Sequence, residues 1–228
     1  MRNCYQPSDS GRLVIDKKLT RDKFNLKNNQ FVFCCFNTAH KINPKIFDSW
    51  ANILRETNNS VIWLTENNNI SQKNLKQEAI IRKIDPERII FCKRTSSQEH
   101  IKRYKLADLF LDTFPYGAHT TANEALFSGL PIVTIIGESF QSRVCSSLLT
   151  TIDLKELITN SYEEYENLAV SIAKNPQKLQ SIKENLRTNI KNSPLFKSKF
   201  YTKNLEKAYI NIYERHNNNL KPENIYIN

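Results

Sequence analysis

Short apolar runs alternate with amphipathic segments of helical length between residues 31 and 136, and this alternation constrains the fold more than any other feature. The first run, Phe31–Phe36, is apolar throughout, as is typical of a strand buried on both faces. Asn43 followed by Pro44 then marks the start of a helix, as N-cap and first helical residue. The next apolar run, Ser60–Leu64, is predicted to be a second strand.

The same alternation continues along the chain. Further strands are predicted at Arg88–Phe91, Leu109–Leu111 and Pro131–Ile136. The helices between them are predicted at Gln72–Lys83, Ser96–Lys105 and Thr121–Ser128. Repeated strand–helix units of this length predict an α/β domain with a parallel sheet and helices on both faces, which is a Rossmann-like arrangement.

Beyond Gln141 the sequence predicts helices and no further strand. These helices are predicted at Ser142–Leu149, Tyr162–Lys174, Pro176–Asn192 and Ser198–Tyr213. The chain therefore divides into a polar lead-in or linker (1–29), an α/β lobe with its C-terminal helices (30–216) and a frayed tail (217–228).

Composition excludes several classes of protein. No stretch approaches the roughly 18 consecutive apolar residues of a membrane helix, and the first ten residues lack the apolar core of a secretory signal. We therefore expect a soluble, cytoplasmic protein. The five cysteines are odd in number and form no CxxC pair, so we expect buried thiols rather than disulfides or a zinc site.

The chain carries 33 basic and 23 acidic residues, a net charge of +10. Such an excess suits polyanions, including nucleic acid, acidic membranes and phosphorylated small molecules. The lysines are scattered among Glu and Asn, however, and the aromatic residues fall on apolar faces rather than between basic residues. A nucleic-acid-binding module is therefore disfavoured, and we expect no membrane partner.

In a parallel α/β sheet, ligands bind beyond the carboxyl ends of the strands, and three polar clusters follow predicted strands here. The longest, Asp112–Glu124, passes through a Pro/Gly turn into a helix that begins near Thr120 and Thr121. Backbone N–H groups and the helix dipole make such a start a phosphate site, which His119 could also reach. Glu124, one turn further, is placed to accept from ribose hydroxyls.

A structural interpretation of this cluster stays open, because Thr121 and Glu124 have the spacing of a capping box. The second cluster, Asn37–Lys41, offers an ammonium group for a diphosphate, although a lysine after a strand is more often solvated.

In the third cluster His100 and Arg103 share one helix face. His100 could stack on a base and Arg103 could reach a phosphate, or the segment is an ordinary basic helix. The chain contains neither GxGxxG nor GxxxxGK[ST], which disfavours NAD-dependent enzymes and P-loop NTPases.

Taken in order, many segments resemble the C-terminal catalytic lobe of the O-GlcNAc transferase/SPINDLY family. They are Phe33–Asn37 with Lys41 and Ile42, Trp50–Leu54, Ser60–Leu64, Arg88–Phe91, Glu99–His100 with Arg103, Leu106–Asp112, His119–Thr121, Gly129–Thr134, Gly137–Ser139 with Ser142–Val144, and Ser193–Phe196. The resemblance extends from Tyr5 to Lys221, and Tyr5–Asp9 is similar to the linker between the family's two lobes. It implies the nucleotide-sugar-binding lobe of a GT-B glycosyltransferase.

This resemblance implies an inverting transfer of GlcNAc from UDP-GlcNAc to Ser/Thr hydroxyls, without a metal or other cofactor. Matched by position, the implied nucleotide-sugar site comprises Thr38, Lys41, His100, Arg103, His119, Thr120, Thr121 and Glu124. Lys41 would stabilise the departing UDP, the His119–Thr121 segment would hold phosphate, and His100 would lie near uracil. Arg103 would support that pocket and Glu124 would take the ribose.

Three positions depart from the family pattern. Thr38 stands in place of a longer amide side chain, Ser97 in place of a lysine near the base, and Glu124 in place of an aspartate. We expect this chain to lack the N-terminal lobe, which supplies much of the acceptor groove in this family, so a missing N-terminal lobe or repeat domain is an expected partner. We therefore expect a donor-binding lobe that is incomplete alone. A transferase using another sugar nucleotide such as GDP-fucose, and a non-catalytic nucleotide-sugar-binding remnant, remain alternatives.

Overall fold

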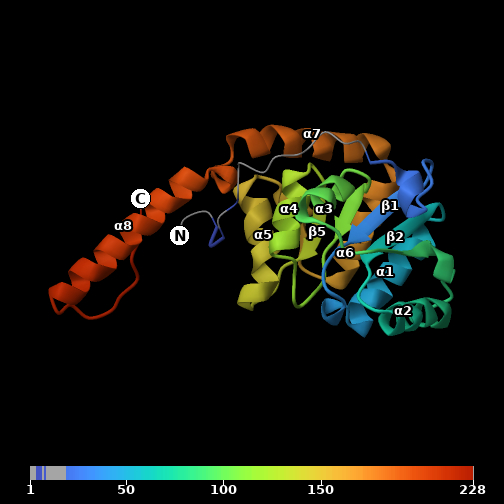
Figure 1. Cartoon of the computed structure of the whole chain (residues 1–228), viewed down its shortest axis with the longest axis horizontal. Helices are drawn as coiled ribbons and strands as arrows, with labels where there is room; N and C mark the ends of the chain where they lie inside the picture. The colour runs from blue at the N-terminus through green and yellow to red at the C-terminus, as the bar shows by residue number, and fades with distance from the viewer. Residues whose placement is uncertain (1–3, 7, 9–18, 228) are drawn as a thin grey trace.

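A computed structural model of the chain describes residues 4–6, 8 and 19–227. Its centre is a six-stranded parallel sheet in the order β3-β2-β1-β4-β5-β6 (Figure 1). The strands are β1 (Phe31–Cys35), β2 (Ser60–Thr65), β3 (Ile89–Cys92), β4 (Leu109–Leu111), β5 (Ile132–Ile135) and β6 (Ile158–Thr159). The order reverses between β1 and β4, which is where ligands bind in doubly wound sheets. The predicted Rossmann-like α/β fold is confirmed.

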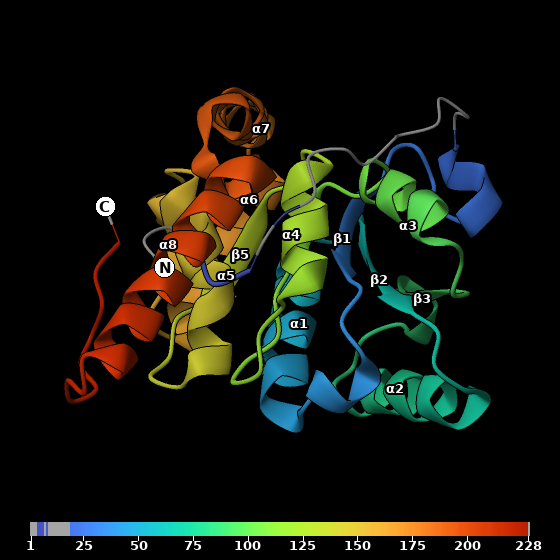
Figure 2. The same ribbon diagram turned by 60° about the vertical axis from the view of Figure 1, so that its left-hand side comes forward.

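Helices cover both faces of this sheet. They are α1 (Pro44–Glu56), α2 (Asn69–Ile81), α3 (Ser97–Tyr104), α4 (Thr120–Phe127), α5 (Phe140–Thr151), α6 (Tyr162–Lys174), α7 (Pro176–Asn192) and α8 (Ser198–Asn217). Helices α3, α4 and α5 contact one another in sequence on one face, whereas α1 packs against α6 on the other (Figure 2). Helix α7 contacts both α4 and α6, so it closes one edge of the two layers.

The core lies between the sheet and these two helical layers. Phe33 of β1 is in register with Ile62 of β2 and Leu109 of β4, and all three side chains are buried. The continuous apolar runs predicted this burial, since a central parallel strand has helices on both faces. All five cysteines are buried and free, Cys34 and Cys35 within β1 itself.

The prediction of no strand after Gln141 is wrong, because β6 pairs with β5 at the sheet's far edge. This strand has only two residues, Ile158–Thr159, and a segment of that length shows no hydrophobic pattern from which a strand could be predicted. Helix α5 also begins two residues before its predicted start, and α8 extends four residues beyond Tyr213. Helix ends depend on local caps, so such shifts are expected.

The described part of the predicted lead-in packs onto the lobe. A 3₁₀ turn at Arg21–Phe24 precedes Leu26, which is buried, and the Arg21 guanidinium pairs with Asp108 at 2.9 Å. The prediction of a polar linker over 1–3, 7 and 9–18, and of a tail at 228, lies outside the described residues.

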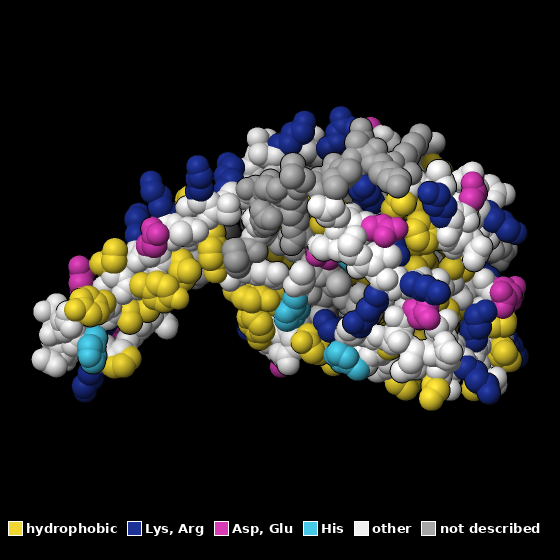
Figure 3. Space-filling model, in the orientation of Figure 1, with side chains coloured by type: hydrophobic (Ala, Val, Ile, Leu, Met, Phe, Trp, Pro, Cys, Tyr) yellow, Lys and Arg dark blue, Asp and Glu magenta, His cyan; other side chains and the backbone are white. Residues whose placement is uncertain are grey.

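Helix α8 projects from the body of the lobe (Figure 1). Hydrophobic side chains gather along it in the space-filling view (Figure 3), and Tyr209, Ile212 and Tyr213 are each more than half exposed. Over the ranges that the structure describes, no helix combines the length and the apolar character needed to cross a bilayer.

Candidate functional site

Two loops and a strand meet at the carboxyl edge of the sheet, and a buried carboxylate joins them. Asp112 directly follows β4, and its Oδ1 accepts hydrogen bonds from the backbone N–H groups of Thr113 (2.8 Å) and Ala118 (2.7 Å). The same Oδ1 accepts from Asn37 Nδ2 of the loop after β1, while Oδ2 accepts from Thr134 Oγ1 of β5. Asp112 therefore fixes the loop that leads from β4 to α4.

Sequence reasoning did not place Asp112 or Asn37 among the site residues. Asn37 is buried, and it links the loops after β1 and β4 by donating to Asp112 and to Thr113 Oγ1 (2.8 Å). Burial raises the pKa of Asp112, and the hydrogen bonds that it accepts oppose that shift. A charged or amide residue directly after an apolar strand was the available signal for both.

Lys41 lies at the end of a 3₁₀ turn, Ala39–Lys41, between β1 and α1. Its Nζ donates to the backbone carbonyl of Gly117 at 2.8 Å and lies 4.0 Å from the centre of the Tyr116 ring. Burial lowers the pKa of Lys41, and the Asp112 carboxylate opposes the shift. The structure therefore brings this ammonium group onto Gly117, three residues before Thr120, the first residue of α4. Among the residues described, none of opposite charge forms an ion pair with it.

Helix α4 begins at Thr120 with His119 as its N-cap residue, and no side chain caps it. The capping-box interpretation of Thr121 and Glu124 is therefore wrong. Thr121 Oγ1 instead donates to Asn37 Oδ1 at 2.6 Å. His119, Thr120 and Lys41 thus share one corner of the sheet's edge, where the backbone N–H groups of the first helical turn are directed.

A second group of predicted residues lies one turn along α4. His100 Nε2 of α3 is 3.8 Å from Glu124 Oε2, and the His100 ring also contacts Phe36 and Tyr104. Burial, followed by the neighbouring Arg103, lowers the pKa of His100 to about 4. At neutral pH the imidazole is uncharged, so its contact with Glu124 is not an ion pair.

Arg103 is buried rather than exposed to the site. Its guanidinium donates to the backbone carbonyl of Lys93 at 2.6 Å and lies over the Phe24 ring. Direct contact with a phosphate, which the spacing allowed, stays a prediction, whereas in the structure Arg103 holds the residue that follows β3. Thr38 lies at the N-cap of the 3₁₀ turn with its side chain half-buried and forms no capping hydrogen bond.

Around His119 the structure adds aromatic residues that sequence reasoning did not assign to the site. The rings of Tyr5, Tyr116 and Phe140 surround the imidazole at centroid distances of 5.6–6.2 Å. Burial lowers the pKa of His119, and the backbone carbonyl of Gln141 opposes this shift. An apolar rim therefore borders the polar corner, as in most small-molecule sites.

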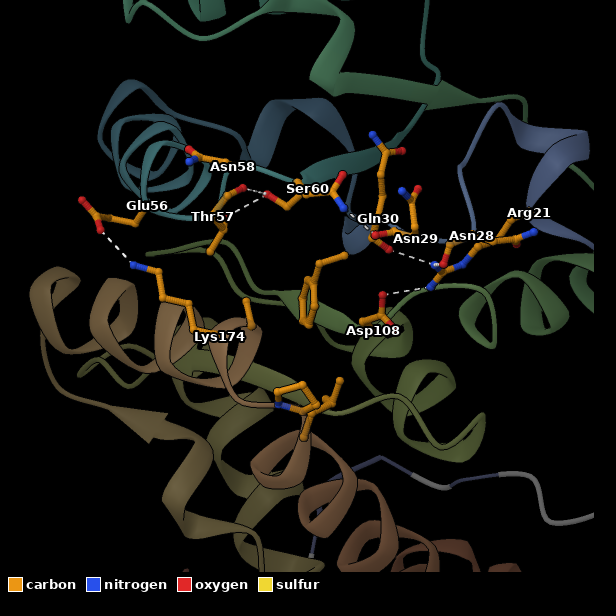
Figure 4. A pocket seen from close by; sticks show the side chains of 15 residues that line it. Arg21, Asn28, Asn29, Gln30, Glu56, Thr57, Asn58, Ser60, Asp108 and Lys174 are labelled. Carbon is orange, nitrogen blue, oxygen red and sulfur yellow. Dashed lines mark hydrogen bonds and ion pairs between the residues drawn. The ribbon is translucent and has the colours of Figure 1, made fainter.

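A groove of about 600 Å³ lies at the opposite, amino edge of the sheet (Figure 4). Its charged side chains are paired with one another, Lys174 with Glu56 at 3.1 Å and Arg21 with Asp108 at 2.9 Å. The residues predicted for the sugar nucleotide do not line it. No cluster of potential metal ligands occurs at either edge within the part of the chain that the structure describes.

Known proteins resemble this chain over most of its length. The sequence profile described as glycosyl transferase family 41 matches residues 10–205. The probable UDP-N-acetylglucosamine–peptide N-acetylglucosaminyltransferase SEC of Arabidopsis thaliana is 34% identical over 99% of this chain and 23% of its own length. The corresponding enzyme of Caenorhabditis elegans is 30% identical over 90% of this chain and 18% of its own. The chain thus spans about a quarter or less of these relatives.

Solved structures give the same result. A mutant of the O-GlcNAc transferase of Thermobaculum terrenum superposes with a TM-score of 0.74 at 30% identity, over 79% of this chain and 35% of that one. Sucrose-phosphate synthase of Thermosynechococcus elongatus, at 12% identity and a TM-score of 0.63 over 85% of this chain and 48% of its own, shares the fold alone. The chain belongs to glycosyl transferase family 41.

Proposed function

We propose that this chain binds UDP-GlcNAc and forms the donor-binding part of an inverting protein O-GlcNAc transferase, which moves GlcNAc to Ser/Thr hydroxyls. The observation that carries the proposal is the meeting of Lys41 with the N-terminus of α4. The Lys41 ammonium bonds to Gly117, and the chain from Gly117 leads through His119 directly into the helix. An ammonium group beside a helix N-terminus matches a diphosphate in charge and in hydrogen-bond donors.

The reaction places negative charge on the leaving diphosphate as the glycosidic bond breaks. In our proposal Lys41 and the first-turn N–H groups of α4 stabilise that charge, and they do so most in the transition state. Their positions are fixed beforehand by Asp112, which accepts from Asn37 and Ala118 on the two sides of the site. The proposed chemistry uses these fixed donors and no metal.

The nucleoside is proposed to lie further along α4, between α3 and α4. Glu124 follows Thr120 by four residues, about 6 Å along a helix axis, so a ribose attached to the diphosphate comes within its reach. The neutral His100 ring, packed on Phe36, offers its remaining edge to a base. Arg103 supports this pocket from behind by holding the Lys93 carbonyl.

The acceptor protein is proposed to bind with the help of a second lobe. The predicted groups that stabilise the leaving UDP all lie on this chain, whereas a transferase must also hold an acceptor hydroxyl within roughly 3–3.5 Å of the sugar. We propose a cytoplasmic setting, because five free, buried thiols fit a reducing compartment.

Titration calorimetry with UDP, GDP and ADP tests the proposed site. We expect UDP to bind most tightly, because the family resemblance implies a uracil site beside His100, whereas the phosphates are common to all three ligands. Equal affinities would mean that the site recognises the phosphates and not the base. Tighter binding of GDP would favour a transferase that uses another sugar nucleotide.

A transfer assay separates binding from catalysis. Labelled UDP-GlcNAc and a peptide mixture are incubated with this chain, with and without a separately produced N-terminal lobe of a relative. We expect UDP binding without transfer by the chain alone, and transfer after mixing. Robust transfer by the chain alone would contradict the incomplete-lobe proposal, and UDP binding with no transfer in either case would favour a non-catalytic role.

A further inference from the structure

A segment more than a hundred residues away in sequence lies over the N-terminus of α4. The hydroxyl of Tyr5 is 3.1 Å from His119 Nδ1, and Gln6 Nε2 donates to Thr120 Oγ1 at 3.3 Å. Ser8, which is buried, accepts a hydrogen bond from the Asn123 amide one turn further on. The segment therefore contacts three residues of the α4 N-terminal region through side chains.

Tyr5 is itself held from two other elements. Its ring lies edge-on to Phe140 of α5 at a centroid distance of 4.9 Å. Its backbone carbonyl accepts a hydrogen bond from the Tyr201 hydroxyl of α8 at 2.8 Å. With both ring and backbone fixed, the hydroxyl is aimed at the imidazole rather than left to rotate in solvent.

The contact between the Tyr5 hydroxyl and His119 Nδ1 can set the tautomer of the imidazole ring. A neutral histidine has one nitrogen that donates and one that accepts, and the partner of one nitrogen sets the role of the other. Burial lowers the pKa of His119, which favours the neutral ring. If the tyrosine hydroxyl donates to Nδ1, the ring proton lies on Nε2, a buried atom for which the geometry gives no hydrogen-bond partner among the residues that the structure describes.

We infer that Tyr5 is a positioning residue for His119: its hydroxyl donates to Nδ1 and thereby fixes both the Nε2–H tautomer and the orientation of the ring at the start of α4. Tyr201 supports this arrangement by holding the Tyr5 backbone. An effect of this positioning on UDP binding rests on the proposed function, in which the His119–Thr121 segment holds the diphosphate.

The tautomer can be measured in the free chain by NMR with ¹⁵N-labelled histidine. The chain has four histidines, so a His119→Gln variant assigns the signals of His119. We expect a pyridine-like Nδ1 and a protonated Nε2. Tyr5→Phe keeps the ring contact with Phe140 and removes only the hydroxyl, and it should give a mixture of both tautomers. Tyr209→Phe, on the exposed part of α8, should leave the spectrum unchanged.

Titration with UDP then measures the consequence. Loss of one oriented hydrogen bond is expected to weaken UDP binding roughly three- to tenfold in Tyr5→Phe, less in Tyr201→Phe and not in Tyr209→Phe. A proton on Nδ1 in the unaltered chain, or a tautomer unchanged by Tyr5→Phe, would overturn the inference. A shifted tautomer in a chain that binds no UDP would support the positioning role while rejecting the proposed donor site.

Discussion

The two edges of the central sheet are built from similar residues and differ in what those residues are free to do. At the amino edge, arginine side chains donate hydrogen bonds to the backbone carbonyl groups at the ends of helices. Arg88 donates to the Leu54 and Thr57 carbonyls at the end of α1, at 2.8 and 2.7 Å. Arg21 donates to the Leu106 carbonyl just after α3 at 3.0 Å. The hydrogen bonds of these arginines therefore go to helix C-termini, where the helix dipole favours a positive charge.

At the carboxyl edge the helices begin, so the backbone presents N–H groups instead of carbonyls. Lys41 there donates to one carbonyl, that of Gly117, whereas Lys174 at the amino edge pairs with Glu56. The buried Asp112 orders the loops from beneath without neutralising the surface of the corner. The direction of the strands and helices, more than the number of basic residues, decides which edge can bind an anion.

The largest expected effect is a difference in stability between variants of Asp112, at the carboxyl edge, and of Asp108, at the amino edge. Asp112→Ala should lower the free energy of unfolding by about 4 kcal/mol, because it leaves buried partners, including the Thr113 and Ala118 N–H groups, without an acceptor. Asp108→Ala removes a partly exposed carboxylate that accepts from Arg21 and Val32, and should cost about 1 kcal/mol. Urea denaturation measures both, and equal losses would contradict the distinction between the edges.

Family and fold were predictable from the sequence because they depend on features that recur along the chain. The apolar runs at Phe31–Phe36 and Ser60–Leu64 belong to central strands, where burial on both faces leaves a clear pattern. The edge strand at Ile158–Thr159 has no such pattern and was missed. Its position is set by pairing with β5, which is a tertiary contact.

The convergence of the candidate residues was predictable from the sequence, whereas their contacts were less so. Residues after strands were expected to converge, and Lys41 and His119 do lie at one corner. Spacing could not show that Thr121 donates to Asn37 or that Arg103 is buried, because both depend on which way a side chain turns. Tyr5 was beyond prediction for the same reason, since its contact with His119 spans most of the chain.

Acid should destabilise the carboxyl edge through His100. Its pKa is about 4 in the folded protein against about 6.5 when unfolded. Between these pH values the unfolded chain binds a proton that the folded chain does not. The contribution of the neutral His100 to the free energy of unfolding is therefore complete above pH 6.5. It is lost as the pH falls toward 4, a change on the order of 3 kcal/mol.

Stability curves for the unaltered chain and for His100→Gln test this over that pH range. The variant should show a flatter fall, because glutamine does not titrate. His216→Gln, on the exposed end of α8, is the matched control and should keep the original slope. A slope that is the same in all three proteins would show that other groups cause the acid sensitivity.

Binding of UDP should distinguish the lysines of the two edges. Lys41→Ala is expected to weaken UDP binding by about 2 kcal/mol, the scale of a hydrogen bond to a charged group. Lys174→Ala removes an equal charge at the amino edge, where the side chain is exposed and paired with Glu56, and should change little. Equal effects in calorimetry would mean that general positive charge attracts UDP and that Lys41 has no special place.

The smallest expected effect divides two adjacent threonines at the start of α4. The Thr121 hydroxyl proton is used on Asn37 Oδ1, whereas Thr120 Oγ1 accepts from Gln6 and keeps its own proton for another acceptor. Thr120→Val should therefore weaken UDP binding by about 1 kcal/mol with little change in stability. Thr121→Val should do the reverse, with a loss of about 1 kcal/mol in unfolding free energy, because the buried Asn37 oxygen loses its partner.

Calorimetry gives the UDP affinity of each variant, and urea denaturation gives its free energy of unfolding. If Thr121→Val weakens UDP binding as much as Thr120→Val does, ligand binding must break the bond to Asn37, and the corner is less rigid than the structure indicates.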